Sequence, residues 1–348
     1  MTATRTVPDL RAQNRRLLTQ DLELRRPVPR SLPSRIRLET TSRCNYGCLH
    51  CFKRREPDDE PQHTMPMKLW DQVAREVFPH TDVVELGFGG EPLQDPLLAE
   101  RLATFDPDGP KLDLLTAGLE LESWIDRLVP FLGRLTISVE ALDQELYPMV
   151  RKGADLGVLL RGIEAFRRAI EGLPEPERPR LGFRVTLFGG NHALLASIIA
   201  RLGQLGAGEV RLVHGLGLEE NHKDLQITKR RMDIGVALQR AVLQGELMGV
   251  AVHYPPVAPV PVWPEDAARF RADAALPADA PWTRAAVAAD GEVTLCCGTR
   301  HLAGVPHVAL TSKGFRAAWT DPAFQVVRAA EEPVVACGFC PNAEGIHG

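Results

Sequence analysis

The chain has 348 residues, of which 44% are hydrophobic and 25% charged, a balance typical of a soluble protein with one large or two modest domains. Its net charge of -4 gives no reason to expect a nucleic acid or an anionic membrane surface as partner. No apolar run approaches the ~18 residues of a membrane span, and residues 1–30 lack the apolar core of a signal peptide. We therefore expect a cytoplasmic protein.

Residues 1–34 contain four prolines and predict an extended N-terminal arm with one helix over Leu10–Leu24. From Arg35 onward, short apolar runs alternate with amphipathic helical stretches. The predicted strands are Ile36–Thr40, Val83–Phe88, Leu112–Thr116, Leu135–Val139, Phe183–Phe188 and Glu209–Val213. The predicted helices between them include Lys68–Phe78, Leu119–Leu132, Leu156–Ile170 and His192–Leu205.

Six β/α units imply a parallel sheet with right-handed crossovers. A complete eight-unit barrel needs about 250 residues, more than the segment 35–226 supplies. The sequence therefore predicts an α/β fold whose main domain, residues 35–226, is a partial (β/α)6 TIM-like barrel. In such barrels the functional residues lie at the carboxyl ends of the strands.

Beyond the barrel, residues 227–280 predict a linker made of one helix and a connection rich in proline and alanine. Residues 281–348 predict a small C-terminal domain. Its Asp290-Gly291 pair is a hairpin signal between two short strands, Ala285–Ala288 and Val293–Cys296. A final helix over Gly314–Ala330 follows.

The seven cysteines fall into two groups. Cys44, Cys48 and Cys51 have the spacing C-x3-C-x2-C, and three thiolates this close can hold three irons of an iron–sulfur cube and leave the fourth iron open. A zinc site or a disulfide framework is the alternative. Zinc requires four ligands, and His50 between Cys48 and Cys51 is too cramped to complete a tetrahedron. Disulfides are typical of small secreted domains.

A second motif, Gly89-Gly90-Glu91-Pro92, follows the apolar run that ends at Phe88. Glycines allow a ligand to approach the backbone closely, and exposed carbonyls near Glu91 suit a positively charged amino group. Alone, such a motif indicates only a turn. Its place at a barrel strand end, after the cysteine motif, favours a binding site.

Together the two motifs resemble those of the radical S-adenosylmethionine (SAM) enzymes. The resemblance implies that Cys44, Cys48 and Cys51 hold a [4Fe-4S] cluster whose open iron chelates the amino and carboxylate groups of SAM. One electron then cleaves SAM to methionine and a 5′-deoxyadenosyl radical, which abstracts a substrate hydrogen. In the family, the glycine motif binds the methionine amino group. An electron donor such as flavodoxin or ferredoxin would be the protein partner.

The resemblance also suggests further SAM contacts. His50 stands where the family usually has an aromatic residue near adenine, and Ser138 resembles the ribose contact. The remaining candidates are Glu140, Arg151 for the SAM carboxylate, Thr186, Asn191 and His214. For three of them a simpler interpretation is open: a solvent-facing loop histidine for His50, a surface charge for Arg151 and a core-edge histidine for His214.

The C-terminal part resembles the auxiliary-cluster domains called SPASM and twitch. The resemblance implies a second [4Fe-4S] cluster on Cys296, Cys337 and Cys340. The family usually has another cysteine just before the position of Pro281-Trp282, and this chain lacks it. Cys297 is therefore the missing ligand, a free thiol or inert packing, and we favour the free thiol.

The reaction predicted by the resemblance begins with hydrogen abstraction from a small-molecule or carbohydrate-type substrate in natural-product biosynthesis. A thiol such as Cys297 could return a hydrogen to the opposite face, which is epimerisation, the outcome that we favour. Dehydrogenation with the auxiliary cluster as electron acceptor and peptide maturation are the alternatives. An electron-transfer module that is no enzyme would leave the Gly89 motif unexplained. The substrate and the oligomeric state cannot be predicted from the sequence.

Overall fold

The computed structural model describes residues 6–51, 62–87, 89–214, 231–254, 279–295 and 306–330. All six predicted barrel strands are present, each hydrogen-bonded in parallel to its neighbour. They are β1 (Arg35–Leu38), β3 (Val83–Leu86), β4 (Lys111–Thr116), β5 (Leu132–Ser138), β7 (Arg180–Leu187) and β8 (Glu209–His214). This confirms the predicted α/β fold with a partial barrel.

Four more strands extend the same sheet at its two edges. A short strand, β9 (Ala251–His253), lies parallel to β8. At the opposite edge, β10 (Arg284–Val287) pairs in parallel with β1, followed by antiparallel β11 (Glu292–Thr294) and β12 (Val308–Ala309). The order is β12-β11-β10-β1-β3-β4-β5-β7-β8-β9. In the described residues the sheet is therefore open, and the two edge strands do not pair with each other.

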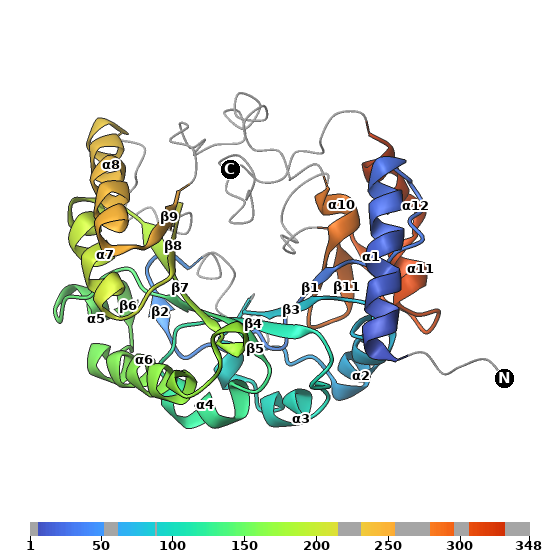
Figure 1. Ribbon diagram of the computed structural model, residues 1–348, viewed down its shortest axis with the longest axis horizontal. Helices are drawn as coiled ribbons and strands as arrows, with labels where there is room; N and C mark the ends of the chain where they lie inside the picture. Colours follow the sequence, from blue (N-terminus) through green and yellow to red (C-terminus); the bar gives the residue numbers. More distant parts are fainter. Residues whose placement is uncertain are drawn as a thin grey trace.

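Helices cover the convex side of the curved sheet (Figure 1). They are α2 (Met67–Val77), α3 (Leu98–Leu102), α4 (Leu121–Leu128), α6 (Leu156–Glu171) and α7 (Leu195–Gln204), with α8 (Arg231–Met248) packed on α7. Short pieces lie at the strand ends: β2 (Gly47–Cys48), α5 (Leu146–Val150), β6 (Arg151–Lys152) and the 3-10 turns η2 (Pro92–Gln94), η3 (Glu175–Glu177) and η4 (His192–Leu194). None of the helices among the described residues has the length and apolar character needed to cross a membrane.

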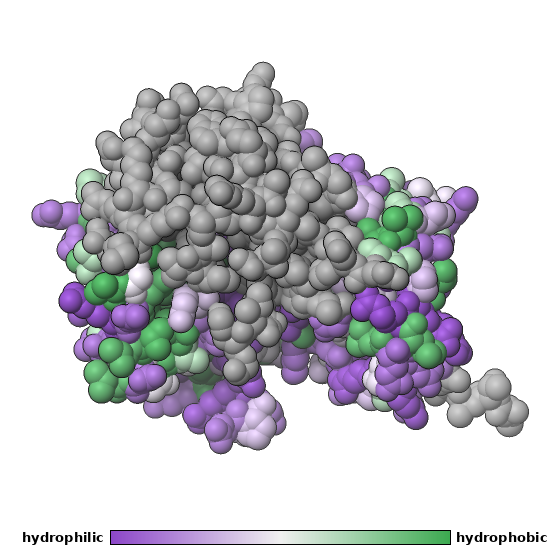
Figure 2. Space-filling model, turned by 90° about the horizontal axis from the view of Figure 1, so that it is seen from above, coloured by the Kyte–Doolittle hydropathy of each residue, from purple (hydrophilic) through white to green (hydrophobic). Residues whose placement is uncertain are grey.

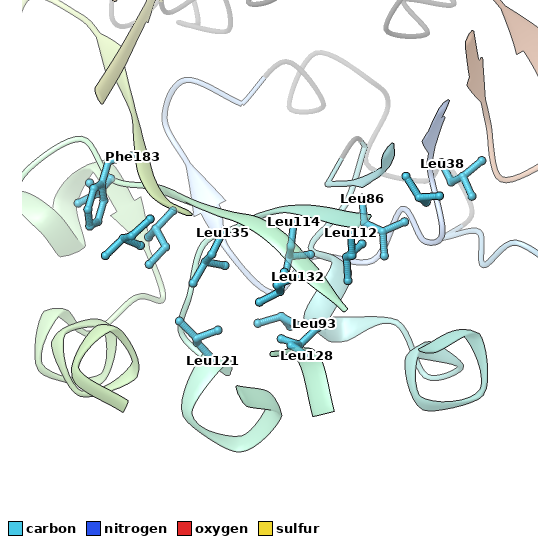
Figure 3. Close-up of a cluster of buried hydrophobic side chains, with 14 of the residues drawn as sticks. Leu38, Leu86, Leu93, Leu112, Leu114, Leu121, Leu128, Leu132, Leu135 and Phe183 are labelled. Carbon is cyan, nitrogen blue, oxygen red and sulfur yellow. The ribbon is translucent and has the colours of Figure 1, made fainter. Parts of the chain in front are cut away.

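The core lies between the convex face of the sheet and these helices (Figure 3). Alternate strand residues point to this face, and they are apolar and almost fully buried, as at Leu38, Leu86, Leu114 and Leu135. Helix residues such as Leu121 meet them from below. Burial of each such side chain contributes roughly 1.5–3 kcal/mol, and this layer fixes where the strand ends lie.

The opposite, concave face of the strands is polar. Arg35 donates to Glu85 and to Asp113, with N–O distances of 2.6 and 3.0 Å, and Arg37 donates to Glu85 at 2.7 Å. Arg134 pairs with Glu209 at 2.9 Å. Complete TIM barrels fill the corresponding space with branched apolar side chains. The polar lining of this sheet suits a lumen that holds a ligand.

The Glu85 pairs predict a specific acid dependence of stability. Burial alone raises the pKa of Glu85, but the Arg37 and Arg35 charges outweigh it and lower the pKa from 4.5 to about 2. The depressed pKa stabilises the fold by about 3 kcal/mol above pH 4.5, and this contribution is lost as the pH falls through about 2. Urea unfolding of the metal-free protein measures this effect. The difference in unfolding free energy between wild type and Glu85→Gln should shrink as the pH falls from 4.5 to about 2.

The matched control for this experiment is Glu122→Gln, because the Glu122 side chain is 58% exposed on α4. Its unfolding free energy should stay close to that of the wild type at every pH. If Glu85→Gln lowered the unfolding free energy by the same amount at pH 6 and at pH 2.5, the ion pairs of Glu85 with Arg35 and Arg37 would not stabilise the fold as described.

The N-terminal helix α1 (Val7–Glu23) is anchored to the C-terminal segment. Thr6 and Asp9 form a capping box at its start. The indole Trp282 Nε1 donates to the Arg26 carbonyl at 2.7 Å, and Trp319 Nε1 donates to the Ser31 carbonyl at 3.0 Å. Helix α10 (Ala280–Thr283) packs on α1, and α11 (Phe315–Trp319) and α12 (Pro322–Ala329) lie beside α1 in Figure 1.

The C-terminal hairpin forms at the predicted Asp290-Gly291 turn, with Gly291 at φ 92°. The prediction of one final helix over Gly314–Ala330 is wrong. Two helices, α11 (Phe315–Trp319) and α12 (Pro322–Ala329), replace it. Pro322 has no N–H to continue a helix, and the Asp321 carboxylate instead accepts from the Ala323 N–H at 2.9 Å, which starts the second helix.

Candidate active site

The first cysteine motif lies in the loop that follows β1. Cys44 is exposed, Cys51 half-buried and Cys48 buried. Cys48 is held in the two-residue strand β2, which pairs antiparallel with β6 so that Cys48 faces Arg151. The Leu49 N–H donates to the Val150 carbonyl at 2.9 Å. The loop is therefore fixed from the segment that follows β5.

The donor set fits an iron–sulfur cluster. Burial raises the pKa of Cys44, and it raises that of Cys48 to about 12, so a buried thiolate here needs a nearby metal charge. Within the described ranges, no three Cys, His, Asp or Glu side chains are grouped to hold one metal ion. The thiolates of a cube bind separate irons and need not meet at a single ion.

The glycine motif is in direct contact with the cysteine loop. The Glu91 N–H donates to the Arg43 carbonyl at 2.8 Å. A Cβ on Gly90 would lie 2.5 Å from that same carbonyl oxygen, and a Cβ on Gly89, whose φ is 89°, would collide with the Glu39 carboxylate. Only glycine permits this approach. The structure thus brings together two motifs that are separated by some forty residues in the chain.

The Glu91 carboxylate is buried beneath the motif. It accepts from the Leu93 N–H at 3.2 Å, the Thr116 hydroxyl at 2.5 Å and the Ala117 N–H at 2.7 Å. Burial raises its pKa although these donors act in the opposite direction. Glu91 therefore joins the start of η2, which Pro92 opens, to the end of β4. This geometry makes Glu91 a residue that positions the loop.

Glu140, just after β5, is the centre of a buried polar cluster. One Arg151 nitrogen lies 3.0 and 2.7 Å from its two carboxylate oxygens, and His50 Nε2 lies 3.3 Å from one of them. The Thr186 hydroxyl also hydrogen-bonds to Glu140. Burial alone raises the pKa of Glu140, but Arg151 and His50 outweigh it and lower the pKa. The carboxylate is thus held ionised.

The simpler interpretations of two cluster members are wrong. The His50 side chain is 13% exposed and that of Arg151 is 5% exposed, so neither is a surface group. Burial lowers the pKa of His50, although the Glu140 carboxylate acts in the opposite direction. His50 Nδ1 and Arg151 Nε are buried with no hydrogen-bond partner among the described residues. Buried polar atoms in need of a partner are expected at a ligand site.

Asn191 connects this cluster to β7. Its amide donates to the carbonyls of Glu140 and Thr186 at 3.0 and 2.9 Å, and its oxygen accepts from the Phe188 N–H at 3.0 Å. All these bonds are buried and internal, so Asn191 holds two strand ends together. Ser138 is half-buried at the end of β5. His214 ends β8, and its side chain lies outside the described residues.

The sequence analysis missed a second, partly buried connection. The Tyr46 hydroxyl donates to Glu120 Oε1 at 2.8 Å, and the Gln94 amide donates to the same oxygen at 2.5 Å. These bonds join the cysteine loop and η2 to the start of α4. The signal available in the sequence was the position of Tyr46 between Cys44 and Cys48, where a side chain must lie against the cluster loop.

The predicted second cluster lies outside the described residues, as do its candidate ligands Cys296, Cys337 and Cys340, and the thiol of Cys297. The described part of the hairpin ends at Leu295, which is buried.

A comparison with protein families matches residues 38–175 to the radical SAM superfamily. Among curated proteins, a tungsten-containing aldehyde ferredoxin oxidoreductase cofactor-modifying protein of Pyrococcus furiosus is 26% identical over 175 residues, covering 49% of this chain and 48% of that protein. GTP 3′,8-cyclase 1 of Pseudomonas aeruginosa is 31% identical over 139 residues, covering 38% and 42%. The chain spans about half the length of the curated relatives that it matches.

Solved structures share the fold. SuiB of Streptococcus suis, bound to S-adenosylmethionine, aligns with 94% of this chain and 75% of its own length, with a TM-score of 0.63 and 14% identity. The structure of anSMEcpe with bound AdoMet aligns with 76% of this chain and 74% of its own, with a TM-score of 0.54 and 15% identity. At these identities the likeness concerns the fold alone. The family match over residues 38–175 and the shared fold make this part of the chain similar to the radical SAM domain.

Proposed function

We propose that this protein is a radical SAM enzyme that cleaves SAM reductively and abstracts a hydrogen atom from its substrate. The observation that carries the proposal is the contact between the cysteine loop and the glycine motif through Arg43, Gly90 and Glu91 at the carboxyl ends of β1 and β3. Active sites of β/α barrels occupy this end of the sheet.

The three thiols of the loop would hold the first [4Fe-4S] cluster, which supplies the electron for SAM cleavage when it is bound. Backbone carbonyls of the Gly89-Gly90 turn would accept from the SAM amino group. Arg151 and His50 would offer their unpartnered nitrogens to the ligand, with Glu140 and Thr186 fixing their orientation. Because the Glu140 cluster is buried, water would be excluded from that side of the cofactor.

The proposal is tested with the anaerobically reconstituted protein, SAM and dithionite. The expected result is 5′-deoxyadenosine and methionine, and a protein that takes up iron but produces neither would be an electron-transfer module instead. The functions of the neighbouring genes would suggest candidate substrates. We expect these substrates to be small molecules or carbohydrates of natural-product biosynthesis.

SAM binding gives a prediction for Ser138, which lies on the concave face beside the Glu140 cluster. Ser138→Ala should weaken SAM binding by roughly tenfold, the effect of one lost hydrogen bond, while iron content stays unchanged. Ser123→Ala is the control, because Ser123 is exposed on α4 and its hydroxyl donates only to the Glu120 carbonyl. Equal SAM affinity in both variants would place the ribose elsewhere.

For the reaction that follows abstraction, we propose epimerisation with Cys297 as hydrogen donor. The support is its position beside a candidate ligand, Cys296, and the absence of any further spare cysteine in the sequence. Cys297→Ala should still form 5′-deoxyadenosine but little epimer. In deuterated water the wild-type product should gain one deuterium at the inverted carbon, because a thiol exchanges its hydrogen with solvent.

Other products would replace the epimerase assignment. A product two hydrogens lighter, without solvent deuterium, would indicate dehydrogenation with the auxiliary cluster as electron acceptor. A crosslink within a peptide would indicate peptide maturation. Loss of iron in Cys297→Ala would make Cys297 the fourth ligand of the second cluster.

A further inference from the structure

The concave face of the sheet contains an arginine-lined pocket of about 100 Å³. Six of its lining residues are arginines, contributed by β10, β1, β5, β7 and β8: Arg35, Arg37, Arg134, Arg184, Arg211 and Arg284. Two carboxylates, Glu85 and Asp113, are the acidic groups among its described lining residues. The pocket is therefore positively charged in a chain whose net charge is -4. Seen from above, both flanks of the described molecule mix hydrophilic and hydrophobic side chains (Figure 2).

The two carboxylates lie toward one side of the pocket. Glu85 forms ion pairs with Arg35 and Arg37, and Asp113 forms one with Arg35. Burial raises the pKa of Asp113 although the Arg35 charge acts in the opposite direction. On the other side, Arg134 pairs with Glu209 at 2.9 Å, and Arg184 and Arg211 make contacts of their own. The guanidinium groups of the lining still outnumber these three carboxylates. The positive excess is a property of the pocket as a whole.

Arg184 and Arg211 are neighbours across the sheet. They are paired in register on β7 and β8, and Ser138 of β5 is paired with Arg184 on the other side. Two guanidinium groups placed opposite each other on one face can both donate to an oxyanion that lies between them. A guanidinium donates two parallel hydrogen bonds to a carboxylate or a phosphate, which makes arginine well suited to both.

The arginine pair also adjoins the cofactor side of the barrel. Arg184 precedes Thr186 by two residues on β7, so both point to the same face, and Thr186 hydrogen-bonds to Glu140. A ligand group held by Arg184 would thus lie deeper in the lumen than the Glu140 cluster and next to it.

We propose that this pocket binds an oxyanion of the substrate, a carboxylate or a phosphate, and that Arg184 and Arg211 determine this specificity. The inference rests on the proposed function, because it assigns a substrate class to the same barrel. It predicts that neutral substrates are not accepted and that small oxyanions occupy the pocket on their own.

The test uses the reconstituted protein with inorganic phosphate and with malonate as probes, with SAM present. Calorimetric titration should show that the protein binds at least one of the two probes. The bound probe should also raise the melting temperature of the protein, because it binds the folded state preferentially. Arg184→Gln and Arg211→Gln should each weaken this binding at least about tenfold. Arg184→Lys keeps the positive charge but cannot donate two parallel hydrogen bonds, so its affinity for the probe should lie between those of the wild type and Arg184→Gln.

Arg180→Gln is the matched control, because Arg180 is exposed at the start of the same strand and does not line the pocket. It should bind the probes as the wild type does. Binding of phosphate but not malonate identifies a phosphate as the substrate group, and the reverse identifies a carboxylate.

Three results would overturn the inference. The first is a wild type that binds neither probe. The second is a pair of variants, Arg184→Gln and Arg211→Gln, that bind as the control does. The third is a loss of SAM affinity in these variants with unchanged anion binding, which would assign the arginines to the cofactor. If the protein binds the anion but forms no 5′-deoxyadenosine, the proposed function fails and the anion site stands.

Discussion

Replacing Cys44, Cys48 and Cys51 together by alanine is expected to abolish formation of 5′-deoxyadenosine from SAM. The three thiols are the only cysteines of the first motif, and without them no open iron is available to the cofactor. The wild type should bind about eight irons, in two [4Fe-4S] clusters, and the triple variant about half as many. Iron analysis and quantification of 5′-deoxyadenosine after anaerobic reconstitution measure both.

The matched control removes a cysteine outside the loop. Cys297→Ala should retain its iron and still form 5′-deoxyadenosine, since abstraction precedes any later hydrogen donation. Residual SAM cleavage by the triple variant would refute the assignment of the first cluster, and iron near four per chain in the wild type would refute the second.

The sequence was sufficient for the barrel because its signals are local. Each of the six strands is a short apolar run or a regular alternation, as at Arg35–Leu38, and the Asp290-Gly291 turn marks a hairpin by itself. The pairing of β10 with β1 joins distant parts of the chain. No local pattern encodes such a contact, and the three-residue strand β9 is too short to show any periodicity.

The sequence was sufficient to predict which residues form the candidate site. It was less sufficient to predict the role of each residue. The cysteine and glycine motifs could be located because their spacing is itself the signal. The partners of Glu91 could not be inferred, because Thr116 and Ala117 approach it only after β3 and β4 pair. The same holds for the arginine-lined pocket, whose arginines come from five strands. Their shared face follows from the register of the sheet.

The Glu140 cluster connects four segments of the site: the cysteine loop through His50, the end of β5, β6 through Arg151, and β7 through Thr186. Its members are buried, so its energetics differ from those of a surface ion pair. A buried charge that loses its partner is left without water or counter-ion. This asymmetry makes the cluster a sensitive test of the geometry.

Glu140→Ala is expected to lower the free energy of unfolding by roughly 3–5 kcal/mol, because it leaves the buried Arg151 guanidinium unpaired. Combining it with Arg151→Met should cost less than the sum of the two single changes, since the double variant contains no uncompensated charge. Urea unfolding of the metal-free protein measures all three variants.

The control pair is Glu122 and Arg161, which lie 3.8 Å apart with side chains 58% and 62% exposed. Glu122→Ala should cost no more than about 1 kcal/mol, because water solvates the remaining charge. If Glu140→Ala lowered the unfolding free energy as little as Glu122→Ala does, water would have to reach Arg151. The cluster of Glu140, His50 and Thr186 would then not exclude water. A strongly sub-additive double variant would instead locate the loss in the unpaired guanidinium, the same group whose remaining nitrogen is available to a bound ligand.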